Sequence, residues 1–157
     1  GEKSVRILVD ADACPGRDLI EKAAMKYEIE VIMYCDMNHI LRSDYSVVKY
    51  IESGFQSVDM AIANVAKAGD IVVTQDYGVA AMVLGKKAYA ISPKGRIYSD
   101  ENIDRLLFER HISAKVRRGG GKTSNHPKKR TSEDDERLYK NMLLLIKKHR
   151  EKTDNRL

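Results

Sequence analysis

The sequence has no apolar run near 18 residues, the length needed for a membrane-spanning helix. It also begins with a short polar stretch, residues 1–4, which does not resemble a secretory signal. We therefore expect a cytoplasmic protein without a membrane partner. Cysteine is scarce, with only Cys14 and Cys35, and in a reducing compartment a structural disulfide between them is not expected.

Zinc-binding patterns are missing as well. The two cysteines and four histidines show no spacing of the C-x-x-C or H-x-x-x-H kind. No internal repeat or low-complexity segment occurs either. A chain of 157 residues is therefore expected to form one domain around a single sizeable core.

Acidic residues are absent from one segment, residues 110–132. Residues 1–109 hold 13 basic and 17 acidic side chains, so an acidic body carries a local basic segment. The eight bases of that segment are Arg110, Lys115, Arg117, Arg118, Lys122, Lys128, Lys129 and Arg130. Such a segment suits a phosphate-rich partner, although a solvated loop would have the same composition.

The pattern of apolar residues alternates between two periods. Short apolar runs predict strands at 5–9, 30–35, 70–74 and 88–92, and the segment 46–51 fits either a further strand or a helical turn. Helical spacing, with capping residues at several helix starts, predicts helices at 15–27, 57–67, 77–84, 99–115 and about 132–149. Glycines and a proline predict a loop over 117–130.

This alternation indicates an α/β fold, with a mainly parallel sheet covered by helices on both faces. We expect an α/β domain at 1–116, a basic Gly-rich loop at 117–131 and a C-terminal helix at 132–157 packed on the same domain. Ligands of such sheets bind beyond the carboxyl ends of the strands.

Carboxylates follow two of the predicted strands at that edge. Asp10 and Asp12 come at the end of the first strand, and Asp76 lies just past the run 70–74. Asp10 and Asp12 would share one side if the chain stayed extended. Because clustered carboxylates repel one another, a cation among them would be stabilising, and hard oxygen ligands favour Mg²⁺ or Mn²⁺.

Structural roles could also explain each of these acids. Asp10 could bond to backbone N–H groups, Asp12 could cap the helix near Pro15, and Asp76 could form an Asx-turn. Asp59 could simply stabilise the first turn of its helix.

Four further residues could border the same edge. They are Cys14, Asp36, Asn38 and Thr74. Thr74 could support the Asp76 loop through its hydroxyl, but an ordinary role as a β-branched strand residue is favoured. Cys14 is expected to be packed beneath the first loop.

Several motifs carry a family resemblance. The segments VDADACP (9–15), SVDMAI (57–62), GDIVVTQD (69–76) and SPKGRIY (92–98) resemble the uncharacterised bacterial YaiI/YqxD family, which is grouped with PIN-like nucleases. The resemblance implies a three-layer PIN-like fold with a five-stranded sheet of order 3-2-1-4-5. It also implies an acidic metal pocket formed by Asp10, Asp59 and Asp76, with Asp12 as an additional carboxylate. A further acid usual in PIN-like nucleases has only distant candidates here, Asp100 and Asp104.

The leading functional hypothesis is a metal-dependent ribonuclease. Asp10, Asp12, Asp59 and Asp76 would bind Mg²⁺ or Mn²⁺ and act in catalysis, and the basic segment, Arg117, Arg118, Lys122, Lys128, Lys129 and Arg130, would bind RNA phosphates. A phosphohydrolase similar to the haloacid dehalogenases, with Asp10 as nucleophile, is one alternative. A non-catalytic RNA-binding or regulatory protein is the other.

Overall fold

The computed structural model describes residues 5–52, 54–120 and 129–154. Within these residues six strands form one sheet, in the order β3-β2-β1-β4-β5-β6. The strands are β1 (Arg6–Asp10), β2 (Glu30–Asp36), β3 (Val47–Ile51), β4 (Ile71–Val73), β5 (Tyr89–Ile91) and β6 (Ile97–Tyr98). The five expected strands pair in parallel in the expected order, and β6 adds an antiparallel edge strand that was not predicted.

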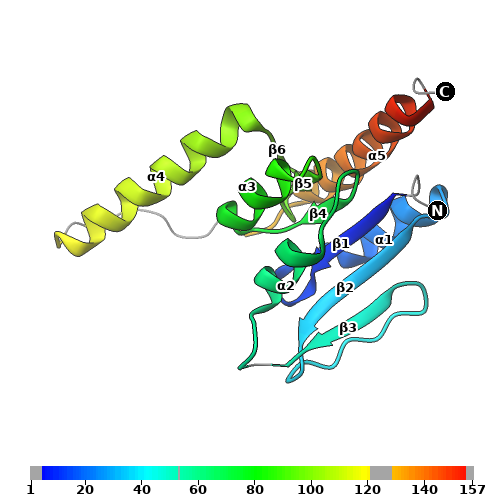
Figure 1. Ribbon diagram of the computed structural model, residues 1–157, viewed down its shortest axis with the longest axis horizontal. Helices are drawn as coiled ribbons and strands as arrows, with labels where there is room; N and C mark the ends of the chain where they lie inside the picture. The colour runs from blue at the N-terminus through cyan, green and yellow to red at the C-terminus, as the bar shows by residue number, and fades with distance from the viewer. Residues whose placement is uncertain (1–4, 53, 121–128, 155–157) are drawn as a thin grey trace.

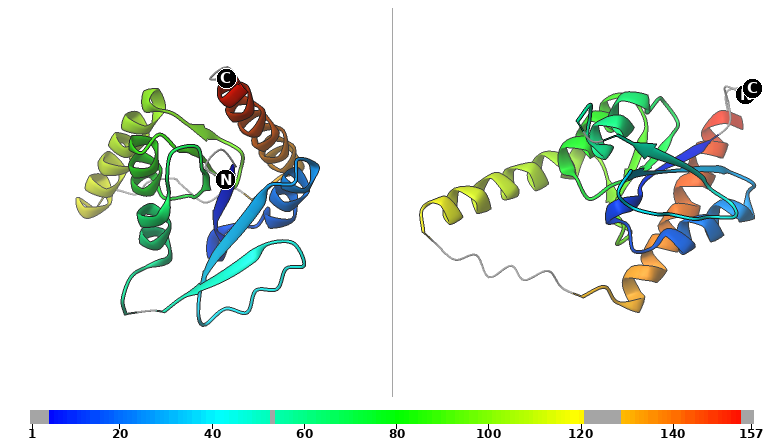
Figure 2. Two further views of the ribbon diagram at one scale, coloured as in Figure 1. Left: turned by 45° about the vertical axis from the view of Figure 1, so that its right-hand side comes forward. Right: turned by 90° about the horizontal axis from the view of Figure 1, so that it is seen from below.

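The helices cover both faces of this sheet, as Figures 1 and 2 show. They are α1 (Arg17–Lys26), α2 (Val58–Val65), α3 (Tyr77–Gly85), α4 (Asp100–Arg118) and α5 (Ser132–Asp154). In the part of the chain that the structure describes, no helix is long and apolar enough to cross a membrane.

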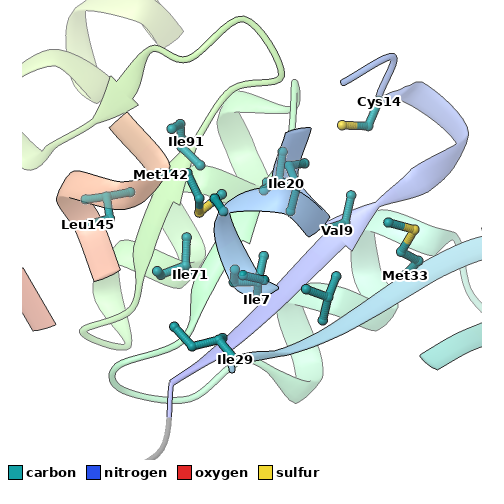
Figure 3. Close-up of a cluster of buried hydrophobic side chains, with 14 of the residues drawn as sticks. Ile7, Val9, Cys14, Ile20, Ile29, Met33, Ile71, Ile91, Met142 and Leu145 are labelled. Atoms are coloured by element: carbon teal, nitrogen blue, oxygen red, sulfur yellow. The ribbon is translucent and has the colours of Figure 1, made fainter. Parts of the chain in front are cut away.

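Residues of β1 show that the sheet separates two apolar cores, one on each face. Ile7 and Val9 are buried against α1 and α5, whereas Leu8 is buried against α2, α3 and α4 on the opposite face. The same alternation along β2 and β4 gives three layers. Figure 3 shows the first core, in which Met142 and Leu145 of α5 approach the sheet.

Helix α5 is fixed to the α/β body by apolar packing. Its buried side chains are Leu138, Met142, Leu145 and Ile146, and burying such a side chain contributes roughly 1.5–3 kcal/mol. Helix α4, in contrast, projects from the sheet beyond its first turns (Figure 1). Only Ile103 and Leu106 of α4 are buried.

The end of α4 differs from the expected loop boundary. The helix continues through Arg118, so Arg117 and Arg118 lie on a helix rather than in a loop. Continuation is physically reasonable because basic residues are favourable in the last turn of a helix. Lys122 and Lys128 lie outside the described residues.

Candidate functional site

A cleft of about 680 Å³ lies at the carboxyl edge of the sheet. Asp10, Asp59 and Asp76 line this cleft, and we call it the acidic cleft. Parallel pairing of β1 with β4 brings Asp10 near the loop that carries Asp76. Helix α2 runs back towards the start of β4, so its first turn, with Asp59, lies at the same edge.

One face of α4 forms another wall of the acidic cleft. The lining residues Leu106, Glu109, Arg110, Ser113 and Arg117 follow helical spacing. Two guanidinium groups therefore stand across the cleft from the strand-end carboxylates. The sequence pattern did not identify Glu109, Arg110 or Ser113 as site residues.

Glu109 is also relevant to the further acid that the resemblance to PIN-like nucleases implies, for which the sequence offered Asp100 and Asp104. Neither Asp100 nor Asp104 lines the cleft, and Glu109 does. Its carboxylate is 3.9 Å from Nε of Arg105, an exposed pair of little energetic weight. Helical spacing from Leu106 could have suggested Glu109, because residues three apart share one face.

Asp10 has the most perturbed carboxyl group of the cleft. Burial raises its pKa to about 6, with further contributions from the negative charges of Asp12, Asp59 and Asp76. Among the described residues, no hydrogen bond or ion pair reaches the Asp10 side chain. Backbone bonding therefore does not account for this carboxylate.

Asp76 is held by two local hydrogen bonds. Its N–H donates to Oγ1 of Thr74 at 3.0 Å, and its carboxylate accepts from the N–H of Val79 at 3.1 Å. Thr74 is itself buried, and its carbonyl accepts from the hydroxyl of Tyr98. Asp76 thus caps α3, and the Thr74 hydroxyl supports the loop.

The Asp12 side chain contacts residues at the end of β2 and in the turn that follows it. Its carboxylate accepts from the N–H of Asp36 at 2.9 Å and lies 3.3 Å from Nδ1 of His39. It neither lines the acidic cleft nor caps α1, whose N-cap is Gly16. The condition under which Asp10 and Asp12 would share one side is not met, since residues 11–13 form a 3-10 turn that redirects the chain.

The remaining rim candidates, Asp36, Asn38 and Cys14, do not line the acidic cleft. Asp36 accepts from the N–H of Asn38 in the turn after β2, and neither residue lines the cleft. Cys14 is buried beneath the first loop, and that burial raises the pKa of its thiol to about 11. A neutral, enclosed thiol is a poor nucleophile.

The structure describes four of the six predicted phosphate-binding bases, and they do not gather at one place. Arg117 lines the acidic cleft, while Arg118 and Lys129 are exposed. Arg130 is tied to the body, donating to Asp135 and to the carbonyl of Pro93, both at 2.7 Å.

The carboxylates of the acidic cleft match a hard divalent cation in chemistry. In the described ranges no three His, Cys, Asp or Glu side chains are close enough to hold a metal directly. Mg²⁺ usually keeps several waters and binds through one or two carboxylates. An acidic cleft with loosely spaced carboxylates therefore fits that ion. The pKa of Asp10 is raised first by burial and then by the neighbouring negative charges, and a cation would relieve that repulsion.

Comparisons with known proteins agree on one family. The model of the uncharacterised YaiI/YqxD family matches residues 8–148. A UPF0178 protein of Clostridium novyi is 71% identical over 150 residues, covering 96% of this chain and 100% of that protein. One from Clostridium tetani is 67% identical, covering 92% and 98%, and one from Clostridium perfringens is 57% identical, covering 92% and 96%. No solved structure matches. The chain belongs to the uncharacterised YaiI/YqxD family.

Proposed function

We propose that this protein is a divalent-metal-dependent nuclease that hydrolyses phosphodiester bonds in RNA. One observation carries the proposal: the carboxylates of Asp10, Asp59 and Asp76 share a cleft with the guanidinium groups of Arg110 and Arg117. Carboxylates suit a divalent cation, and guanidinium groups suit phosphate oxygens. The resemblance to PIN-like nucleases points to the same reaction class.

In this proposal Asp10, Asp59 and Asp76 would hold Mg²⁺ or Mn²⁺, one or two of them directly and the rest through water molecules that the ion keeps. When bound, such an ion supplies an activated water and stabilises negative charge on a phosphoryl oxygen. Arg110 and Arg117, on α4, bind the phosphate of the RNA backbone and position the scissile phosphodiester in the acidic cleft. Thr74 keeps the Asp76 loop in place through the 3.0 Å hydrogen bond.

The geometry disfavours the phosphohydrolase alternative. That mechanism needs Asp12 beside Asp10 as the acid–base group. The Asp12 carboxylate is instead engaged by the N–H of Asp36 and lies near His39.

The decisive experiment is cleavage of labelled single-stranded RNA with Mn²⁺, Mg²⁺ or chelator. Asp10→Asn and Asp76→Asn should each slow cleavage roughly a hundredfold or more, since several kcal/mol of charge stabilisation are lost. Asn remains a good helix N-cap, so Asp76→Asn tests the charge rather than the cap.

The matched control is Asp104→Asn, because Asp104 is exposed on α4 and does not line the acidic cleft. It should cleave as wild type does. Cleavage by all three variants at the wild-type rate would refute the assignment. RNA binding without turnover in any metal would favour a non-catalytic RNA-binding protein.

A further inference from the structure

A second cleft, of about 890 Å³, lies between the β5–β6 turn and the start of α5. Four basic side chains line it, and Asp134 is its one acidic lining residue in the described part of the chain. The bases are Lys94, Arg96, Arg130 and Arg137. We call it the basic cleft. Its lining has a net charge of +3, counted from those four bases and one acid.

Two of the bases are already engaged with acids. Arg130 pairs with Asp135 at 2.7 Å, and Arg137 pairs with Asp134 at 2.9 Å. The turn contributes the other two bases, Lys94 and Arg96, whose side chains are both exposed. Lys94 also interacts electrostatically with Asp134.

The turn that carries these two bases is anchored at three consecutive carbonyls. The carbonyl of Pro93 accepts from Arg130, that of Lys94 from Arg137, and that of Gly95 from Asn141. The distances are 2.7, 3.2 and 2.7 Å. Side chains around the start of α5 thus hold the turn in one position, which limits the entropy lost when a ligand binds.

The basic and acidic clefts meet at one loop. Gln75 and Tyr77 line both clefts, and they flank Asp76 in the sequence. The Tyr77 ring is partly exposed and packs edge-to-face on Tyr98, with ring centroids 5.9 Å apart. An aromatic side chain at this junction can stack against an unpaired base.

We propose that the basic cleft binds backbone phosphates of a single-stranded nucleic acid whose neighbouring phosphodiester lies in the acidic cleft. This inference rests on the proposed function, which is the reason for choosing single-stranded RNA as the ligand. It assigns Lys94 and Arg96 to phosphate binding and Tyr77 to base stacking at the junction. Recognition then requires a strand long enough to span both clefts, rather than a single nucleotide.

Binding measured in chelator tests this without any need for cleavage. The probe is a fluorescent single-stranded RNA of about 12 nucleotides, within the usual site-size range for single strands, followed by anisotropy across a salt series. Lys94→Gln/Arg96→Gln should weaken binding roughly tenfold and reduce the salt slope by about 1–2, as loss of two phosphate contacts predicts. Tyr77→Ala, made in the wild-type protein, should weaken binding by roughly fivefold or more, because a stacking contact is lost.

The matched control is Lys49→Gln/Lys152→Gln, which removes the same charge from exposed sites outside both clefts. Its binding and slope should be closer to wild type. Equal losses in both double variants would mean general electrostatic attraction and would overturn the inference.

Two further probes separate strand binding from simpler anion binding. A dinucleotide and inorganic phosphate should compete poorly with the longer RNA. Competition as strong as that of the unlabelled 12-mer would mean a small-anion pocket and would also overturn the inference. If wild-type protein binds the strand as expected but never cleaves it, the proposed nuclease activity fails while the basic cleft stands.

Discussion

The backbone N–H of Asp36 donates to the carboxylate of Asp12 across 2.9 Å, joining the end of β2 to the turn that follows β1. This bond gives Asp12 a structural task outside the acidic cleft. Asp12 still acts on the cleft at a distance, because its charge contributes to the raised pKa of Asp10.

The first prediction follows from that bond. Asp12→Ala should lower the free energy of unfolding by about 1 kcal/mol, since a backbone donor loses its partner. Asp12→Asn, which keeps an acceptor, should cost less and should slow RNA cleavage much less than Asp10→Asn. Urea unfolding and a cleavage assay on the three variants measure this. An Asp12→Asn defect as large as that of Asp10→Asn would make Asp12 a direct site residue.

The second prediction concerns pH. The pKa of Asp10 is raised from 3.8 to about 6, so the folded chain holds a proton that the unfolded chain has already released. The stability gained from this proton is fully present below pH 3.8 and is lost as pH rises through about 6. In chelator, Asp10→Asn should therefore be more stable than wild type at pH 8, and the difference should shrink towards pH 4.5.

The size of this effect is modest. A rise in the pKa of Asp10 from 3.8 to about 6 corresponds to roughly 3 kcal/mol. Solvent screening of a partly exposed carboxylate reduces this to about 1 kcal/mol. Urea unfolding at the two pH values measures it, with Asp104→Asn as the control for loss of an exposed charge. A wild type that is more stable than Asp10→Asn at pH 8 would contradict the burial and repulsion at Asp10.

Much of the arrangement at the sheet edge could be predicted from the sequence. Apolar runs located the five parallel strands, and the rule that strand ends meet at one edge placed Asp10 and Asp76 together. Asp59 came from family resemblance rather than from periodicity. The two-residue strand β6 was missed because so short a segment shows no alternation.

Other features of the site depend on tertiary structure. Polar residues surround most of α4, so the sequence did not indicate which face meets the acidic cleft. The side on which the Asp12 side chain lies could not be predicted, because residues 11–13 form a 3-10 turn, where the two-residue period of a strand no longer applies. The basic cleft combines residues 92–96 with α5, and local patterns do not reveal such distant neighbours.

The third prediction tests the anchored turn. Gly95 has φ +90, and a Cβ there would lie 2.5 Å from the backbone nitrogen of Leu138. Gly95→Ala should therefore lower the free energy of unfolding by about 2 kcal/mol or more, through steric overlap and backbone strain.

Gly85 provides the matched control for that substitution. A Cβ at this helical position meets nothing within 4 Å, so Gly85→Ala should stabilise the protein by roughly 0.5–1 kcal/mol. Thermal unfolding of both variants makes the comparison. If Gly95→Ala were as stable as Gly85→Ala, the close contact between the turn and α5 would be wrong.

The last prediction concerns the cation expected in the acidic cleft. A ligand that binds only the folded state raises stability by mass action, and here it would also relieve the repulsion felt by Asp10. Millimolar Mn²⁺ should therefore raise the Tm of wild type by several degrees. Asp10→Asn/Asp76→Asn should start from an equal or higher Tm in chelator, because two like charges are gone, and should gain little from Mn²⁺. Asp104→Asn, which keeps the cleft intact, should respond as wild type does. An equal Tm increase in wild type and in the double variant would locate Mn²⁺ binding elsewhere, and the proposed metal site would then have to be abandoned.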